Sequence, residues 1–146
     1  MSESSAGKLY TPDLLSLATE LAGWPLKDEL NLRSEARSRN CGSSITLGLN
    51  LTENSKISDV GMQVSACAIG QASSAILARH AVGLNAHEVV AVERSVAQWL
   101  MGDGEMPDWP DFHHLLPAQQ HKGRHGALIL PWNALSQALS KVGIAG

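Results

Sequence analysis

Residues 39–82 read RNCGSSITLGLNLTENSKISDVGMQVSACAIGQASSAILARHAV. Apolar and polar side chains alternate over 45–51 and again over 60–66, and the turn-forming segment Glu53-Asn54-Ser55 lies between these two runs. A period of two is typical of half-buried strands, so we predict two neighbouring strands with a short connection. Residues 68–81 then change to helical spacing. The order strand, strand, helix is the centre of the predicted fold.

The rest of the chain adds one strand and several helices. Leu30 and Leu32 alternate with polar neighbours toward Arg39, which predicts a strand before the other two. Three consecutive strands with short connections favour an antiparallel meander. We expect further helices from Thr11 to Gly23, from Asn85 to Leu100, over 112–116, and over 126–142 with a kink or boundary at Pro131. The predicted class is α+β, a three-stranded antiparallel sheet packed against several helices.

Length and charge exclude several classes of protein. With 146 residues and 44% hydrophobic residues, the chain has enough apolar material for one core, so we expect a tail at 1–8 and a single domain at 9–146. A net charge of −3 argues against a nucleic-acid binder, which needs clustered basic side chains. No apolar run approaches the roughly 20 residues that span a bilayer, and the start resembles no secretion signal. We therefore expect a cytoplasmic protein that binds neither nucleic acid nor membrane.

The chain has two cysteines, and both are predicted at ends of elements. Cys41 falls in the predicted turn beside Gly42, where glycine allows a sharp bend. Cys67 falls where a strand gives way to a helix, and a helix N-terminus favours thiolate over thiol. The two thiols could converge as metal ligands or sulfur carriers, or they could pack as small apolar groups. The residues alone leave both interpretations open.

Three segments carry a family resemblance. Asn40-Cys41-Gly42 looks like an N-x-x-C-G-D turn, and Ile57-Ser58-Asp59 with 67–74 is similar to an I-x-D…G-C-A-I-S-x-A-S-A-S stretch. Residues 124–135, RHGALILPWNAL, look like R-x-x-C-A-x-L-P-W-x-A-L. Together they resemble the U-type iron–sulfur cluster scaffold family, which comprises IscU, SufU and the N-terminal domain of NifU. The resemblance covers roughly Thr11 to Leu139.

The resemblance implies a function in iron–sulfur cluster assembly. Cys41 and Cys67 would hold a [2Fe–2S] cluster or zinc, or would accept persulfide sulfur from a cysteine desulfurase. The products would pass to recipient apo-proteins or carrier proteins. Because sulfur release would be catalysed by the desulfurase, the chain is expected to be a non-enzymatic scaffold. The alternative is that it accepts sulfur in the manner of a sulfurtransferase. Ala127, at the third-cysteine position, follows Cys67 by 60 positions (127 − 67), which resembles the SufU branch with an insertion at about 102–121.

Two departures from the family pattern weaken the predicted site. Ala127 replaces the third cysteine, and Ser43 replaces the aspartate that follows Cys-Gly. Cys41 and Cys67 are then two strong ligands of about four, whereas a structural zinc site needs four.

Histidines near Ala127 could supply the missing ligands. His113, His114, His121 and His125 fall within thirteen residues of one another. Because imidazole is a good zinc ligand, His125 and His121 are the candidate replacements. The alternative is a solvated insertion that is rich in histidine.

Further alternatives stay open for the function, for Arg124 and for one loop. The chain could be a degenerate relative that only binds a partner of the assembly machinery, or a homo-oligomer in which a second chain completes the site. Arg124 could screen a thiolate, contact a partner, or be an ordinary surface charge. The loop 102–110, with Met106 and Trp109, is expected either to form a local core or to present a docking surface.

Overall fold

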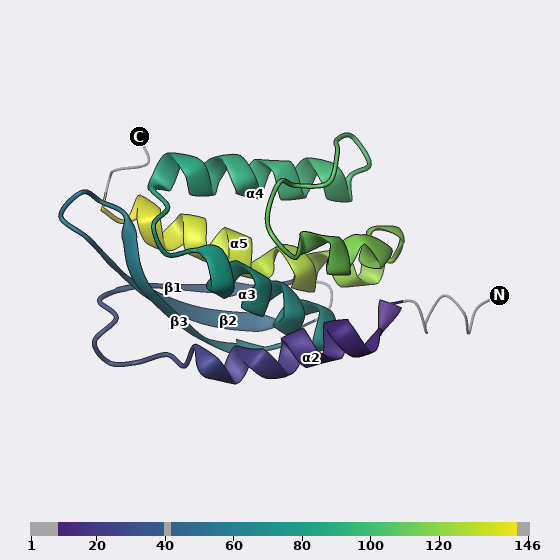
Figure 1. Ribbon diagram of the computed structural model, residues 1–146, viewed down its shortest axis with the longest axis horizontal. Helices are drawn as coiled ribbons and strands as arrows, with labels where there is room; N and C mark the ends of the chain where they lie inside the picture. The colour runs from purple at the N-terminus through teal and green to yellow at the C-terminus, as the bar shows by residue number, and fades with distance from the viewer. Residues whose placement is uncertain (1–8, 40–41, 143–146) are drawn as a thin grey trace.

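The protein has an α+β architecture. The structure, a computed structural model, describes residues 9–39 and 42–142 (Figure 1). Strands β1 (Leu32–Arg37), β2 (Ser44–Leu51) and β3 (Ile57–Ser65) form one antiparallel sheet in the order β1-β2-β3. The predicted meander is confirmed.

Helical segments make up most of the remaining described chain. In chain order they are α2 (Pro12–Glu20), η1 (Leu21–Gly23), α3 (Ala68–His80), α4 (Ala86–Leu100), η2 (Phe112–Gln120), η3 (Lys122–Arg124) and α5 (His125–Ser140). Within the two described ranges, no helix combines the length and the apolar character that crossing a bilayer requires.

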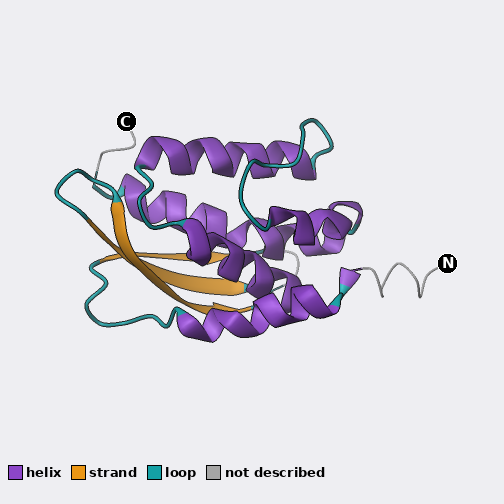
Figure 2. Cartoon of the chain, viewed as in Figure 1, coloured by secondary structure: helices purple, strands orange, loops and turns teal. Residues whose placement is uncertain are grey.

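The helices form layers on one face of the sheet (Figure 2). Helices α3 and α5 contact the strands directly, α4 packs on the far side of α5, and α2 packs along α3. Most residues at the centre of β2 and β3 that point toward this layer are buried, as the alternation predicts. They include Ile45, Leu47, Leu49, Val60 and Met62. The core therefore lies between the sheet and α3 and α5.

Local capping chemistry sets where the helices begin. The Thr11 hydroxyl accepts a hydrogen bond from Leu14 N at 3.1 Å, and proline follows in the first turn of α2. Asn85 and Glu88 form the predicted capping box at the start of α4. Both starts are therefore determined by residues within one turn.

The sequence pattern misplaced the start of β3. The alternation predicted a strand from Val60, but β3 begins at Ile57, which pairs with Leu51 across a register shift. Ile57 N also donates to Leu84 O at 2.9 Å, and Gly83 N donates to Ile57 O at 2.8 Å. These nonlocal bonds extend the strand beyond the alternating segment.

The loop after α4 is part of the main core. Trp109 is buried, its indole N–H donates to Ile76 O at 2.9 Å, and its ring meets Trp132 edge-to-face at 4.9 Å. Of the two alternatives for this loop, Trp109 therefore follows the core one, whereas Met106 is exposed. The helical piece predicted at 112–116 continues as a 3₁₀ helix to Gln120.

The segment Trp24–Leu30 crosses the opposite face of the sheet. Gly48 and Gly61 are cross-strand partners, and a Cβ on Gly61 would lie 2.1 Å from Pro25 O. Glycine is therefore required there for close backbone approach. Met62 N donates to Trp24 O at 2.9 Å, which ties this segment to the edge of β3.

Candidate functional site

A hollow lies where β3 ends and α3 begins. Its volume is about 260 Å³, and the residues that line it come from three separate parts of the chain. They are Gly42, Ser43, Ser65, Ala66, Cys67 and Arg124. The only thiol among the described residues thus opens into a shallow, mostly polar depression.

Cys67 occupies the N-cap position of α3. Its backbone is extended, with φ −67° and ψ 173°, and its carbonyl accepts the first helical hydrogen bond from Gln71 N at 3.0 Å. Its side chain makes no capping bond, and the thiol is free and partly exposed. The strand-to-helix junction therefore presents the sulfur to the hollow without engaging it locally.

The other wall of the hollow is the start of β2. Gly42 has φ +72°, a left-handed conformation that favours glycine. Ser43, which the sequence resemblance aligns with an aspartate, is buried, and its carbonyl accepts from Ser38 N at 2.9 Å. The predicted turn includes Asn40 and the candidate ligand Cys41, which lie outside the described residues. The residues that follow Cys41 in sequence are thus on the same hollow as Cys67.

Ala127 lies beside the first turn of α3. It is 1% exposed, and a Cβ built on Gly70 would be 3.2 Å from the Ala127 Cβ and 2.7 Å from the Ala66 Cβ. Residues 66 and 70 flank Cys67 on the helix start. Ala127, which the sequence resemblance aligns with a third cysteine, therefore packs its methyl group against the start of α3, the helix that Cys67 caps.

Arg124 supplies the charge in the hollow. It is the only ionisable residue besides Cys67 among those that line the depression. Its Nε donates to the Tyr10 hydroxyl at 3.1 Å, so the start of the α2 region holds the guanidinium stem in place. Sequence analysis missed Tyr10, because 114 residues separate it from Arg124 and no local pattern links them.

The candidate histidines do not line the hollow. His125 Nε2 lies 2.7 Å from Gln119 O, and His121 caps the short helix η3. The rings of His113 and His114 stack on each other at 4.1 Å. The structure therefore places these side chains in or beside the insertion.

The described residues do not fit a closed metal centre. Over residues 9–39 and 42–142, no three His, Cys, Asp or Glu side chains group around a common point. A structural zinc site needs four such ligands in tetrahedral geometry. Cys67, with Ala127 and Ser43 in place of the family ligands, provides one.

Comparisons with known proteins agree with this fold. The model of the NifU-like N-terminal domain family matches residues 25–140. The crystal structure of a nitrogen-fixing NifU-like protein (N-terminal) from Brucella abortus is similar at TM-score 0.87 and 26% identity, covering 95% of this chain and 97% of that one. The search of curated proteins found no match.

A second solved structure shares the fold. It is a protein from the thermophile Fervidobacterium islandicum AW-1, assigned as an iron–sulfur cluster assembly scaffold protein for the SUF system. The TM-score is 0.80 at 20% identity, with 90% of this chain and 96% of that chain covered.

Proposed function

The chain belongs to the NifU-like N-terminal domain family, and we propose that it serves iron–sulfur cluster assembly as a scaffold-type protein that accepts sulfur on Cys67. The partner is a cysteine desulfurase, and the later recipients are apo-proteins or carriers. The observation that carries the proposal is the free Cys67 thiol, partly exposed on a hollow beside Arg124. The 60-residue spacing before Ala127 favours the SufU-like branch.

The proposed step is a transfer of sulfane sulfur between two thiols. The Cys67 thiolate attacks the outer sulfur of a desulfurase persulfide, and a new S–S bond forms on Cys67. The S–S bond of the donor breaks, and its electron pair leaves on the donor cysteine as a thiolate. No external oxidant is needed, because one sulfane sulfur moves between equivalent partners. The Arg124 guanidinium lines the same hollow and brings a positive charge to it.

A metal or cluster is cargo in this proposal and not a resident group. A [2Fe–2S] cluster or zinc would need Cys41 and Cys67 together with His125 or His121, or with two thiols from a second copy in a homo-oligomer. Because the described donors do not fit such a centre, the proposed chemistry uses sulfur alone. Sulfur transfer needs reduced thiols, which the cytoplasm maintains, so the proposal places the protein there.

The test is to load the protein with sulfur and count metal in the same preparation. Anaerobically purified protein is incubated with a cysteine desulfurase and L-cysteine, and the mass of the Cys67 peptide is measured. We expect a gain of one sulfur atom on Cys67 that Cys67→Ser abolishes, with Cys41→Ser measured in parallel. Zinc, iron and acid-labile sulfide are counted per chain, so that a half-per-chain value identifies a site shared by two copies.

A second candidate function is a degenerate relative that only binds its partner. The observation that favours it is the buried methyl group of Ala127 beside Gly70 in α3, at the position that the resemblance aligns with a third cysteine. This candidate predicts that the protein folds and binds the desulfurase, but gains neither sulfur nor metal. Loss of sulfur loading with intact binding would therefore replace the first function by the second.

A further inference from the structure

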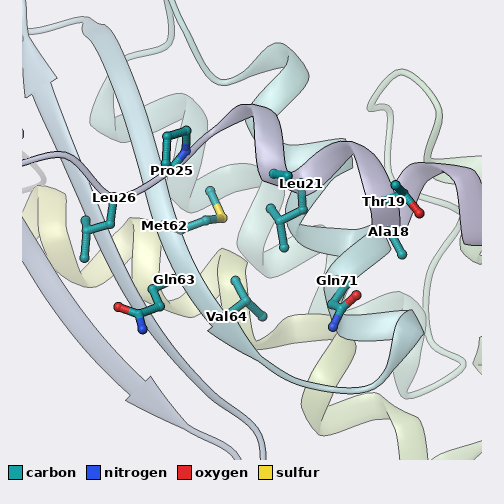
Figure 3. A pocket seen from close by; sticks show the side chains of 10 residues that line it. Ala18, Thr19, Leu21, Pro25, Leu26, Met62, Gln63, Val64 and Gln71 are labelled. Carbon is teal, nitrogen blue, oxygen red and sulfur yellow. The ribbon is translucent and has the colours of Figure 1, made fainter.

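A second hollow lies along the open edge of β3. This groove has a volume of about 520 Å³ and lies between the end of α2, the segment after η1, strand β3 and the start of α3 (Figure 3). The residues that line it share small, apolar or uncharged polar side chains. They are Ala18, Thr19, Leu21, Ala22, Pro25, Leu26, Met62, Gln63, Val64 and Gln71.

The edge of β3 pairs with another segment of the chain at Met62. Met62 N donates to Trp24 O at 2.9 Å, so its backbone points away from β2. Outward-pointing residues alternate along an antiparallel strand, and the next one is Val64. Among the described residues, Val64 N–H has no hydrogen-bond partner on that side. The backbone N–H and C=O of Val64 can therefore pair with another extended chain.

The protein already uses this edge for strand pairing. Pro25 and Met62 form an isolated parallel bridge, so the backbone of the Trp24–Leu26 segment runs in the same direction as β3. That segment then leaves the edge, since Leu26 Cδ1 would lie 3.0 Å from a Cβ on Gly48, over the sheet face. The groove begins where this internal strand departs.

The lining of the groove selects an uncharged occupant. None of its ten residues is ionisable, and Met62, Val64 and Leu21 form an apolar floor. Thr19, Gln63 and Gln71 add one hydroxyl and two amide groups to the lining, which can bind peptide backbone. A charged ligand would lose hydration without a partner there, whereas an extended peptide with small or apolar side chains fits.

The groove leads to the thiol. Val64 precedes Cys67 by three residues, about 10 Å at roughly 3.3 Å per residue. Gln71 lines the groove and donates to Ala66 O at 3.1 Å, while Ala66 lines the hollow of Cys67. A strand paired at Val64 therefore has its next residues directed along β3 toward the sulfur.

We infer that the open edge of β3 docks an extended, uncharged segment of the sulfur-donor protein, which pairs with Val64 and carries its persulfide cysteine to Cys67. This inference rests on the proposed function, because it assumes that Cys67 accepts sulfur. The docking supplies main-chain hydrogen bonds for affinity and groove contacts for specificity. Transfer from a small persulfide needs no such docking.

The test compares two sulfur donors on matched variants. Ala22→Arg places a long charged side chain in the groove from an exposed position, and Val82→Arg places the same side chain on an exposed site outside it. Sulfur on the Cys67 peptide is followed over time, with a persulfidated cysteine desulfurase or with glutathione persulfide as donor. We expect Ala22→Arg to slow transfer from the desulfurase by about tenfold, the scale of a groove-blocking change. Val82→Arg and all reactions with glutathione persulfide should stay at the wild-type rate.

A backbone pair of variants tests the hydrogen bond itself. Val64→Pro removes the outward N–H at an edge position, and Val64→Thr keeps it. Only the proline should slow transfer from the desulfurase, and the Val64 amide of the wild type should exchange hydrogen more slowly in the complex. Thermal unfolding shows whether Val64→Pro folds. If this variant does not fold, the result with Ala22→Arg tests the docking inference.

The outcomes separate the two proposals. If both donors load Cys67 and Ala22→Arg behaves like the wild type, the docking inference is wrong and the sulfur-acceptor function stands. If neither donor loads Cys67, both are wrong. If Ala22→Arg instead changes the oligomeric state of the free protein, a second copy occupies the groove and the inference is again overturned.

Discussion

Gly70 and Ala127 face each other across the α3–α5 interface so closely that a Cβ on Gly70 would lie 3.2 Å from the Cβ of Ala127. Gly70 is one helical turn from the free thiol of Cys67. The contact brings the C-terminal motif to the strand–helix junction, although nearly sixty residues separate them in sequence. Ala127, the residue that the sequence resemblance aligns with a third cysteine, is thus part of the packing of α5 on α3.

The first prediction restores the missing ligands. Ala127→Cys together with Ser43→Asp should raise bound zinc to about one ion per chain, because the site would regain four ligands with Cys41 and Cys67. The added sulfur enters a packed site, so a destabilisation of about 1–3 kcal/mol is expected alongside. Elemental mass spectrometry measures the zinc bound per chain. The control is the same double variant with Cys67→Ser added, which should not bind the ion. An unchanged zinc content would show that position 127 does not face the site.

The second prediction concerns a buried hydrogen-bond relay. Ser73 Oγ donates to Leu128 O at 2.6 Å and accepts from Trp132 Nε1 at 2.9 Å. Ser73→Ala should lower the free energy of unfolding by about 1–3 kcal/mol, because it leaves a buried donor and a buried acceptor unpaired. Urea unfolding measures the change. Ser140→Ala, which removes an exposed bond to Gln137 O, should change stability by less than about 0.5 kcal/mol.

The third prediction concerns acid pH. Hydrogen bonds from His80 and Arg79, at 3.1 and 2.9 Å, hold the pKa of the Asp111 carboxyl below its ordinary value of 3.8. A lowered pKa stabilises the fold above that value and loses its effect as pH falls through the folded pKa. Asp111→Asn should therefore lower the free energy of unfolding at pH 7, by less than about 1 kcal/mol for so exposed a cluster, and match the wild type in acid. Asp108→Asn, exposed nearby, is the control, and a constant difference at all pH values would contradict the assignment.

The fourth prediction has the opposite sign. Burial raises the pKa of Glu93 above 4.5, and a hydrogen bond with Ser136 and the charge of Arg94 offset this only in part. The folded state then binds more protons than the unfolded state, so stability falls as pH rises from 4.5 through the folded pKa. Glu93→Gln should raise Tm at pH 7, and the gain should vanish below about pH 4. Scanning calorimetry at both pH values checks it, and Glu105→Gln, which is exposed, should show no such gain.

Sequence patterns located most elements because their causes are local. The alternation at Ile45, Leu47 and Leu49, the Thr11 cap and the Asn85 capping box each depend on residues within one turn or one strand. The same reasoning placed Cys67 at a strand–helix junction, where the structure has it. It could not place Trp109, since burial there depends on Ile76 O and the Trp132 ring.

Nonlocal contacts decided the candidate site. The sequence alone predicted a thiol at the start of a helix, because the strand and helix patterns meet at Cys67. It also showed that the chain has no third cysteine. Only folding could bring Arg124 to the hollow of that thiol, with Tyr10 as its hydrogen-bond partner, and pack Ala127 against Gly70. Folding likewise decided that His125 lies on Gln119 O and that Met62 pairs with Trp24 at the edge of β3. Side-chain periodicity specifies which face of an element is buried, but the partner that covers it is chosen by packing among elements far apart along the chain.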